Sequence, residues 1–179
     1  MQNLETATLA GGCFWCLDAI YRRVIGVREV VSGYSGGHKE NPTTAEVYEG
    51  HTGHAEVVQI SFSPSVISFR ELLEIFFVMH DPTTLNRQGN DVGDEYRSAV
   101  FFHDEDQRLD ALDMKENFAP TIWKKPIVTQ ITPFSKFWPA GEDHQDFYAK
   151  RPGYGYCQVV IDPKVAKLRQ KFTSKLKPE

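Results

Sequence analysis

Two kinds of hydrophobic pattern alternate along this chain. In some short stretches apolar and polar residues alternate, and in others apolar residues recur at every third or fourth position. The first pattern is typical of strands with one buried face and the second of amphipathic helices. A Ser-x-x-Glu sequence that begins at Ser68 adds a capping box to one of the helices. The patterns predict strands at 4–10, 27–34, 54–62, 96–102 and 127–131, and helices at 14–24, 68–79, 104–118, 143–150 and 162–176.

The order of these elements predicts the fold class. The first six follow one another as β-α-β-β-α-β, which is the order of a split βαβ or ferredoxin-like unit, and an α-β pair comes next. We therefore expect an α/β (α+β) protein, a ferredoxin-like two-layer sandwich with helices packed on a mixed sheet. No linker interrupts the chain, so the expected organisation is a single domain, 1–179, in which residues 150–179 form a C-terminal tail with a cysteine and the last helix.

The sequence Gly-Gly-Cys-Phe-Trp-Cys stands between the first strand and the first helix. Its two glycines permit a tight turn, so Cys13 is expected at the N-terminus of the helix. Unpaired amides and the positive end of the helix dipole favour the thiolate there, which is the reactive form of cysteine. Phe14 and Trp15 place an apolar wall beside the sulfur. The pattern indicates a nucleophilic or redox-active Cys13, with Cys16 as the second thiol of a Cys-x-x-Cys pair.

Composition is that of an ordinary soluble globular protein, with 41% hydrophobic and 25% charged residues. The net charge of -4 gives no electrostatic reason to expect a nucleic acid partner. The first residues lack the pattern of a signal peptide, and no apolar run approaches the length of a membrane span. We therefore expect a cytoplasmic protein. In a reducing compartment its three cysteines indicate catalysis, redox chemistry or metal binding.

Two histidines precede a glutamate in the sequence His-Thr-Gly-His-Ala-Glu. Together with Cys13 and Cys16, His51 and His54 make four candidate zinc ligands, although the two histidines are closer in sequence than is usual. In the other interpretation Glu56 is a catalytic acid, which requires an apolar pocket that raises its pKa. The pattern leaves both interpretations open.

Two further segments carry candidate groups. Residues 88–98 combine glycines with acidic residues, but their spacing does not match an EF-hand, and Asp91 and Tyr96 are the useful hydrogen-bonding groups. Cys157 follows a glycine-bearing segment. A mobile tail would allow it to approach Cys13, whereas the alternative is a strand residue that leads into 159–161.

Together these motifs resemble those of the A class of peptide methionine sulfoxide reductases. The resemblance extends from Ala10 to the region of Cys157. It rests on Gly-Gly-Cys-Phe-Trp at 11–15, Gly-Tyr-Ser-Gly-Gly at 33–37, Gly-His-Ala-Glu at 53–56, and Gln-Gly-Asn-Asp at 88–91 followed by Tyr-Arg-Ser at 96–98. The family is a single-domain α/β sandwich, which agrees with the predicted order of elements.

The resemblance implies that Cys13 attacks the sulfur of methionine sulfoxide and becomes a sulfenic acid while methionine leaves. Phe14 and Trp15 would hold the methyl group of the substrate. The A class acts on the S epimer, and we expect both protein-bound and free methionine sulfoxide as substrates. A second cysteine would then form a disulfide, and thioredoxin or another dithiol would restore the thiols without a cofactor or a metal.

A sulfoxide oxygen is a poor leaving group unless it is protonated, so the thiolate needs an acid nearby. The resemblance assigns this role to Glu56. Tyr96 would donate a hydrogen bond to the same oxygen, and Asp91 would organise the polar side of the pocket. A glutamate keeps its proton near neutrality only when it is desolvated, and the aromatic neighbours are expected to provide this desolvation.

One position departs from the family pattern. The family has a tyrosine after Asn-Pro-Thr that helps to bind the oxygen, whereas this chain has Thr44 there, and Tyr48 lies one helical turn further along. From this mismatch we expect oxygen binding to rest mainly on Glu56 and Tyr96. Replacement of Tyr96 by Phe should then slow the reductase step strongly.

The cysteine that resolves the sulfenic acid has two candidates. Cys157 matches the recycling cysteine of the family's tail, while the family's second tail cysteine is absent here. Cys16 is three residues from Cys13, but neighbouring turns of a regular helix hold two cysteines awkwardly for a disulfide. We therefore prefer Cys157 and keep Cys16 as its rival.

Two other functions are considered. One is a thioredoxin-like disulfide oxidoreductase that uses Cys13 and Cys16, and the other is a zinc-binding module that adds His51 and His54. Neither explains the group of Glu56, Asp91 and Tyr96. The expected protein is a monomeric enzyme whose partners are oxidised methionine and thioredoxin.

Overall fold

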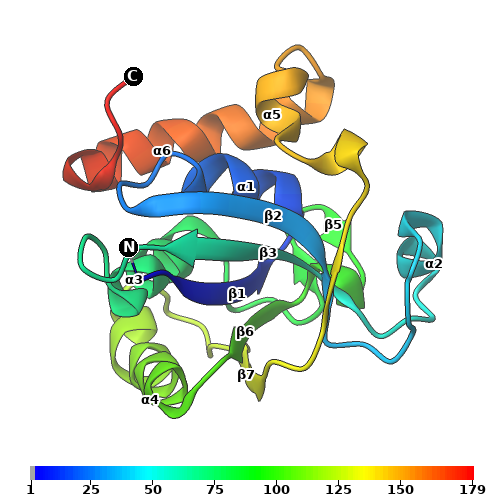
Figure 1. Cartoon of the computed structure of the whole chain (residues 1–179), viewed down its shortest axis with the longest axis horizontal. Helices are drawn as coiled ribbons and strands as arrows, with labels where there is room; N and C mark the ends of the chain where they lie inside the picture. Colours follow the sequence, from blue (N-terminus) through cyan, green and yellow to red (C-terminus); the bar gives the residue numbers. More distant parts are fainter. Residues whose placement is uncertain (1–2) are drawn as a thin grey trace.

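The computed structural model describes residues 3–179, so residues 1–2 of the predicted domain lie outside the described residues. A six-stranded sheet runs through the middle of the molecule (Figure 1). Its strand order is β7-β6-β1-β3-β2-β8, and all neighbouring strands are antiparallel except β6 and β7. The strands are β1 (Glu5–Gly11), β2 (Val27–Ser35), β3 (Ala55–Phe62), β6 (Ser98–Phe102), β7 (Gln130–Pro133) and β8 (Phe137–Pro139).

The order of the four central strands confirms the predicted fold class. β1 and β2 are joined by the helix α1 (Phe14–Tyr21) and leave a gap between them that β3 fills. β3 and β6 are joined by α3 (Phe69–Met79), and β1 lies between those two strands. These interleaved β-α-β units are the split βαβ arrangement of a ferredoxin-like sandwich. The parallel pairing of β7 with β6 makes the sheet mixed.

The remaining elements are short. The other α-helices are α2 (Thr44–Glu49), α4 (Glu105–Asp113), α5 (Phe147–Lys150) and α6 (Asp162–Phe172). A two-stranded hairpin consists of β4 (Arg87–Gln88) and β5 (Asp91–Val92). Single helical turns are η1 (Asp94–Tyr96), η2 (Met114–Phe118), η3 (Ala119–Thr121), η4 (Glu142–His144), η5 (Cys157–Ile161) and η6 (Thr173–Lys175). No helix in residues 3–179 is long and apolar enough to cross a membrane.

The main core lies between the sheet and the helices α1, α3 and α6, which also contact one another (Figure 1). β3 buries side chains on both faces. Val58, Ile60 and Phe62 belong to the main core, whereas Ala55 and Val57 belong to a smaller cluster on the other face. Because successive side chains of a strand point to opposite faces, Glu56 shares the face of Val58 and Ile60, beneath the helices.

The expected capping box of α3 is present. Ser68 accepts a hydrogen bond from the Glu71 amide, and the Glu71 carboxylate accepts one from the Ser68 amide. A second capping box, formed by Thr43 and Glu46, begins α2. The sequence pattern places no helix between the strands predicted at 27–34 and 54–62, and this prediction was wrong for α2, because polar residues dominate a helix this short and exposed.

The C-terminal part differs most from the prediction. β8 lies where the pattern is irregular, and it pairs with the outer edge of β2. Gly33 of β2 permits this pairing, since a Cβ there would lie 2.5 Å from the ring of Phe137. The last helix begins with η5 rather than at a cap, because η5 continues directly into α6. Cys157 is therefore a helical residue and does not lie in a strand.

Smaller differences concern where elements begin and end. The first helix stops at Tyr21, and the segment predicted as helix 143–150 contains η4 and α5. The predicted fifth strand is displaced to β7, and Tyr96 belongs to η1 instead of the fourth strand. The segment between the helix predicted at 68–79 and the strand predicted at 96–102 contains the β4–β5 hairpin, which brings Asp91 to the centre described next.

Candidate active site

Cys13 lies where β1 turns through two glycines into α1, as the sequence predicts. It is the N-cap residue of the helix, with a non-helical backbone (φ -58°, ψ 127°). Gly12 has a φ of +89°, and a Cβ at this position would lie 2.6 Å from Cγ of Gln88. Gln88 is fixed in turn by two hydrogen bonds of 2.9 Å to the backbone of Asp81. The turn that carries the cysteine is thus held against the β4–β5 hairpin.

Glu56 is buried beside this turn. It lies on β3 directly opposite Tyr34 of β2, and its side chain is fully covered. Oε1 accepts a hydrogen bond of 3.0 Å from the amide of Phe14, and Oε2 is buried without a hydrogen-bond partner in residues 3–179. Burial raises the pKa of Glu56 to about 8, although the Phe14 amide opposes the shift. At neutral pH the carboxyl group is therefore mostly protonated.

The two thiols of the Cys-x-x-Cys pair differ in acidity. Burial, the hydrogen bond with Cys16 and the charge of Glu56 raise the pKa of Cys13 well above its usual value. The hydrogen bond from Cys13, together with the charge of Lys164 and the hydroxyl of Tyr156, lowers the pKa of Cys16 to about 7. Without substrate, the proton stays on Cys13 and the thiolate forms at Cys16. The amide of Trp15 in the first helical turn opposes the rise at Cys13 but does not outweigh burial, and the amide of Phe14 bonds to Glu56 instead.

Asp91 and Tyr96 reach the same centre from the segment between α3 and β6. The hydroxyl of Tyr156 donates a hydrogen bond of 2.7 Å to Oδ2 of Asp91 and lies 3.8 Å from the sulfur of Cys16. Burial and the nearby charges of Glu56 and Cys13 raise the pKa of Tyr96. The structure therefore brings Asp91 and Tyr96 close to the carboxyl group of Glu56 and the thiols of Cys13 and Cys16. It also places Tyr156 there, which the motifs did not single out.

An aromatic wall stands next to Cys13. The indole of Trp15 stacks on the ring of Phe147, with 3.7 Å between ring centroids and 5° between ring planes. Phe14 and Trp15 both contact His144, at centroid distances of 5.6 and 5.8 Å, and Tyr156 meets the edge of Trp15. The sequence predicts Phe14 and Trp15 as this wall, but it contains no motif that marks His144 or Phe147.

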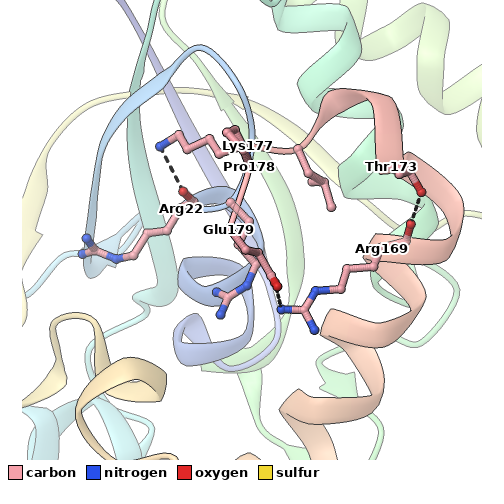
Figure 2. A pocket seen from close by; sticks show the side chains of 8 residues that line it. Arg22, Arg169, Thr173, Lys177, Pro178 and Glu179 are labelled. Atoms are coloured by element: carbon pink, nitrogen blue, oxygen red, sulfur yellow. Dashed lines mark hydrogen bonds and ion pairs between the residues drawn. The ribbon is translucent and has the colours of Figure 1, made fainter.

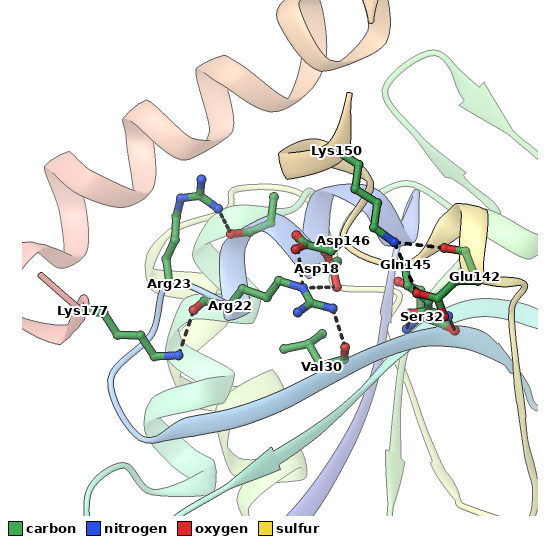
Figure 3. Close-up of polar contacts among 11 residues, drawn as sticks. Asp18, Arg22, Arg23, Val30, Ser32, Glu142, Gln145, Asp146, Lys150 and Lys177 are labelled. Atoms are coloured by element: carbon green, nitrogen blue, oxygen red, sulfur yellow. Dashed lines mark hydrogen bonds and ion pairs between the residues drawn. The ribbon is translucent and has the colours of Figure 1, made fainter. Parts of the chain in front are cut away.

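A polar cluster fixes this wall to α1 (Figure 3). Arg22 forms ion pairs with Asp18 at 2.9 Å and Asp146 at 3.5 Å, and it donates a hydrogen bond to the carbonyl of Val30. Asp146 directly precedes Phe147 and has a left-handed backbone (φ 49°). Burial raises the pKa of Asp18 to about 6. The cluster therefore holds the segment that supplies Phe147.

Thr44, which replaces the family's tyrosine, lies at the start of α2. Its Oγ1 is 2.8 Å from the hydroxyl of Tyr34 and 3.4 Å from Nε2 of His144. The bridge joins β2, α2 and the C-terminal part of the chain. Tyr34 also packs against Phe14, with 5.6 Å between ring centroids.

Cys157 is covered completely at the start of η5, which packs on α1. Burial and the charges of Asp162 and Cys16 raise the pKa of its thiol. Its neighbour among the cysteines is therefore Cys16. All three cysteines are free thiols.

The two histidines of the zinc hypothesis do not join the cysteines. His54 accepts a hydrogen bond at Nδ1 from the Gly37 amide and donates from Nε2 to the carbonyl of Lys39, at 3.0 and 2.7 Å. His51 is exposed. Over the described part of the chain, no group of three or more His, Cys, Asp or Glu residues is arranged to hold a metal ion.

A basic cleft of about 660 Å³ lies away from this centre, near the C-terminal end of the chain (Figure 2). Its charged residues are largely engaged within the protein. Arg169 pairs with Glu179, and Lys177 donates a hydrogen bond to the carbonyl of Arg22. Arg22 of the polar cluster lines it, but none of the predicted catalytic or substrate-binding residues does. This cleft is therefore not the reactive centre.

Comparison with known proteins agrees with this geometry. The family model "Peptide methionine sulfoxide reductase" matches residues 5–176. A peptide methionine sulfoxide reductase MsrA of Sulfolobus acidocaldarius is 55% identical over 172 residues, which cover 96% of this chain and 97% of that protein. Reduced Mxr1 from Saccharomyces cerevisiae is similar in structure, with a TM-score of 0.79, 36% identity, and coverage of 86% of this chain and 89% of that one.

A second structure of Mxr1, in complex with Trx2, has a TM-score of 0.56 and 30% identity, and covers 80% of this chain and 84% of that one. These comparisons favour neither the thioredoxin-like alternative nor the zinc-binding module. The extent of the family match and the level of identity show that this chain belongs to the peptide methionine sulfoxide reductase family.

Proposed function

We propose that this chain reduces the S epimer of methionine sulfoxide to methionine, in proteins and as the free amino acid, with Cys13 as nucleophile and Glu56 as acid. One observation carries the assignment of roles. Glu56 is a buried carboxyl group that is protonated near neutrality, and its Oε2 is unpartnered within the described chain beside Cys13. A sulfoxide oxygen is an acceptor that this group can protonate.

The aromatic wall supports a substrate orientation. Phe14 and Trp15, backed by Phe147, would receive the methyl group of the substrate. The oxygen would then point to the acid and to the phenol of Tyr96. Asp91 would act through the hydroxyl of Tyr156, which it holds at 2.7 Å. This orientation distinguishes the two epimers. In the R epimer the oxygen and the lone pair on sulfur exchange places, so with the methyl group held at the wall the oxygen would point away from Glu56.

In the proposed chemical step the thiolate of Cys13 attacks the sulfur of the substrate. Protonation by Glu56 turns the oxygen into a leaving group, and hydrogen bonds to that oxygen stabilise its developing charge. A bond forms between the sulfur of Cys13 and the sulfur of the substrate as the S–O bond breaks, and the protonated oxygen leaves as water. Water then attacks the sulfur of Cys13, the bond between the two sulfurs breaks, and Cys13 becomes a sulfenic acid. Methionine leaves with the sulfur reduced by two electrons. Since Cys13 is a neutral thiol in the free protein, polarised substrate is needed to stabilise its thiolate.

We propose a relay through both remaining cysteines for the return to the thiol state. Cys16 hydrogen-bonds to Cys13 and has the lower pKa, so it would attack the sulfenic sulfur and release water. Cys13 precedes the helix with a non-helical backbone, which removes the objection that both lie in regular helical turns. The thiolate of Cys157 would then attack Cys16, restore the thiol of Cys13 and leave a Cys16–Cys157 disulfide.

A dithiol protein of the thioredoxin type is the proposed reductant for this disulfide. The Mxr1 complex with Trx2 supports the choice. Three free thiols support a reducing, cytoplasmic setting, and we propose that the chain acts there as a monomeric single catalytic domain.

The direct test is incubation of the wild type and Cys13→Ser with each separate epimer of methionine sulfoxide and a dithiol reductant. The wild type should reduce the S epimer only, and the variant should reduce neither. Absence of reduction by the wild type would contradict the proposed activity. Full activity of Cys13→Ser would contradict the assignment of the nucleophile.

A further inference from the structure

The hydroxyl of Thr44 is already engaged. Tyr34 and Glu56 are direct partners across the β2–β3 pair, so their side chains lie on the same face of the sheet. The hydroxyl of Tyr34 bonds to Thr44 at 2.8 Å, and Thr44 also faces His144. The first turn of α2 is thereby fixed above the acid. The side chain at position 44 serves as a bridge between elements.

Tyr48 projects from the same face of α2. It follows Thr44 by four residues, and residues at this spacing lie one above the other on a helix. The capping box and Gly50, with φ +83°, fix the two ends of α2, and Val47 anchors it to the core. Tyr48 is 47% exposed as a residue and does not belong to either core cluster. Packing therefore does not explain a tyrosine here.

The pKa of Tyr48 reflects its surroundings. Burial of the hydroxyl raises the pKa of Tyr48, and the nearby charges of Glu56, Tyr96 and Cys13 add to the shift. Tyr48 is therefore near enough to the acid and the nucleophile to feel their charges, although the residue is half exposed. Tyr96 is influenced by the same two groups. Two phenols, one from α2 and one from η1, flank Glu56.

We infer that Tyr48 is a catalytic residue, which donates a hydrogen bond to the sulfoxide oxygen together with Tyr96. The inference rests on the proposed function, because it assumes that the oxygen lies between Glu56 and the two phenols. Negative charge grows on this oxygen as Cys13 attacks, and a prepositioned donor stabilises it. The chain thus supplies from the second turn of α2 the phenol that is missing at position 44.

The test measures the reductase step alone. Wild type and Tyr48→Phe are mixed with excess S epimer without any reductant, and methionine is measured as a function of time. Loss of the donor should slow its formation by about tenfold to a hundredfold. Thr44→Tyr in the Tyr48→Phe background places a phenol at the other position and should restore part of the rate. Tyr148→Phe removes a phenol that bonds to Asp162 instead and is the matched control.

A second measurement separates hydrogen bonding from a structural role. Dimethyl sulfoxide and dimethyl sulfide are compared as competitive inhibitors, since only the former carries the oxygen. Tyr48→Phe should weaken inhibition by the sulfoxide and leave inhibition by the sulfide unchanged. A rate within twofold of the wild type, or equal weakening of both inhibitors, would overturn the inference. Failure of the proposed function is recognised separately, because the wild type would then form no methionine, or Cys13→Ser would form it as fast as the wild type.

Discussion

The amide of Phe14 donates a hydrogen bond of 3.0 Å to Oε1 of Glu56. One residue of α1 thus fixes the acid of β3 relative to the nucleophile that precedes it, and the other carboxyl oxygen stays available. The same amide would otherwise be an unpaired donor at the helix N-terminus. The helix therefore acts on the acid through the amide of Phe14 and on Cys13 through the amide of Trp15.

Replacement of Glu56 by Gln should remove the acid and retain this geometry. The amide oxygen of Gln can still accept the hydrogen bond from Phe14, but Gln has no acidic proton to transfer. We expect the reductase step to slow by about 10²–10⁴-fold. Single-turnover formation of methionine measures the effect, with thermal unfolding as the control for folding. A variant that forms methionine at the wild-type rate would show that another group protonates the oxygen.

The rate of the reductase step should depend on the protonation of the same carboxyl. Because its pKa is about 8, Glu56 carries its proton below pH 8 and loses it above. We expect kcat/KM for methionine formation to fall as pH rises through about 8. In Glu56→Gln the residual rate should lack this decrease. An identical decrease in the variant would assign it to a different group.

His80 should link folding stability to pH. Burial lowers its pKa to about 4, and its ring is held between the Phe76 carbonyl and the Ser98 hydroxyl. The folded state therefore binds fewer protons than the unfolded state between pH 4 and 6.5, so this residue's contribution to stability falls as pH decreases over that range.

The corresponding experiment compares urea unfolding of the wild type and His80→Gln at several pH values. The difference in free energy of unfolding should shrink by up to about 3 kcal/mol between pH 7 and pH 4. Glu56 acts in the opposite sense, because its raised pKa makes the folded state less stable as pH rises from 4.5 to about 8. Because the wild type and His80→Gln both contain Glu56, the difference between them removes the contribution of Glu56. A constant difference would show that His80 does not titrate as described.

Gly12→Ala should cost more stability than Gly50→Ala. Both glycines have a positive φ, +89° and +83°, but only a Cβ at Gly12 meets another residue, Gln88. We expect about 1–2 kcal/mol from the backbone at each position and about 1–3 kcal/mol more from the overlap at Gly12. Chemical denaturation of both variants measures the difference. Equal losses of stability in the two variants would mean that the β4–β5 hairpin moves away from the new Cβ at position 12 without cost.

Peptide mapping after one turnover should identify the order in which the three cysteines react. In the relay, Cys157→Ser should accumulate a Cys13–Cys16 disulfide, and the wild type should accumulate Cys16–Cys157. Cys16→Ser should retain a sulfenic acid on Cys13 that a dimedone probe captures. A Cys13–Cys157 disulfide in the wild type would show that Cys157 resolves the sulfenic acid directly, as the sequence analysis prefers. Cys16 would then not be an intermediary.

The central part of the fold could be predicted from sequence because its signals are local and regular. Alternation of polar and apolar residues from Val58 to Phe62 marks β3, the double glycine marks the turn before Cys13, and Ser68 with Glu71 marks the start of α3. α2 was missed although its Thr43-x-x-Glu46 box has the same form as that of α3. Its single buried residue, Val47, gives no helical periodicity to detect.

The site was only partly predictable, because its motifs name residues and not their surroundings. The pattern indicated Glu56 but not that the carboxyl lies beneath the helices with one oxygen free. The hydrogen bond with Cys13 lowers the pKa of Cys16 most, and Lys164 and Tyr156, which lie far along the chain, lower it further. His144 and Phe147 follow β8 in the chain, and the pairing of β8 with β2 brings them to the aromatic wall. That pairing requires a residue without a side chain at Gly33.

The aromatic support of Trp15 comes from the other end of the chain. Residues before Phe137 supply Cys13, Glu56 and Tyr96, whereas His144, Phe147 and Tyr156, which contact Trp15, lie after it. A chain that ended before Phe137 would keep the acid and the nucleophile but leave the indole of Trp15 without its stacking partner.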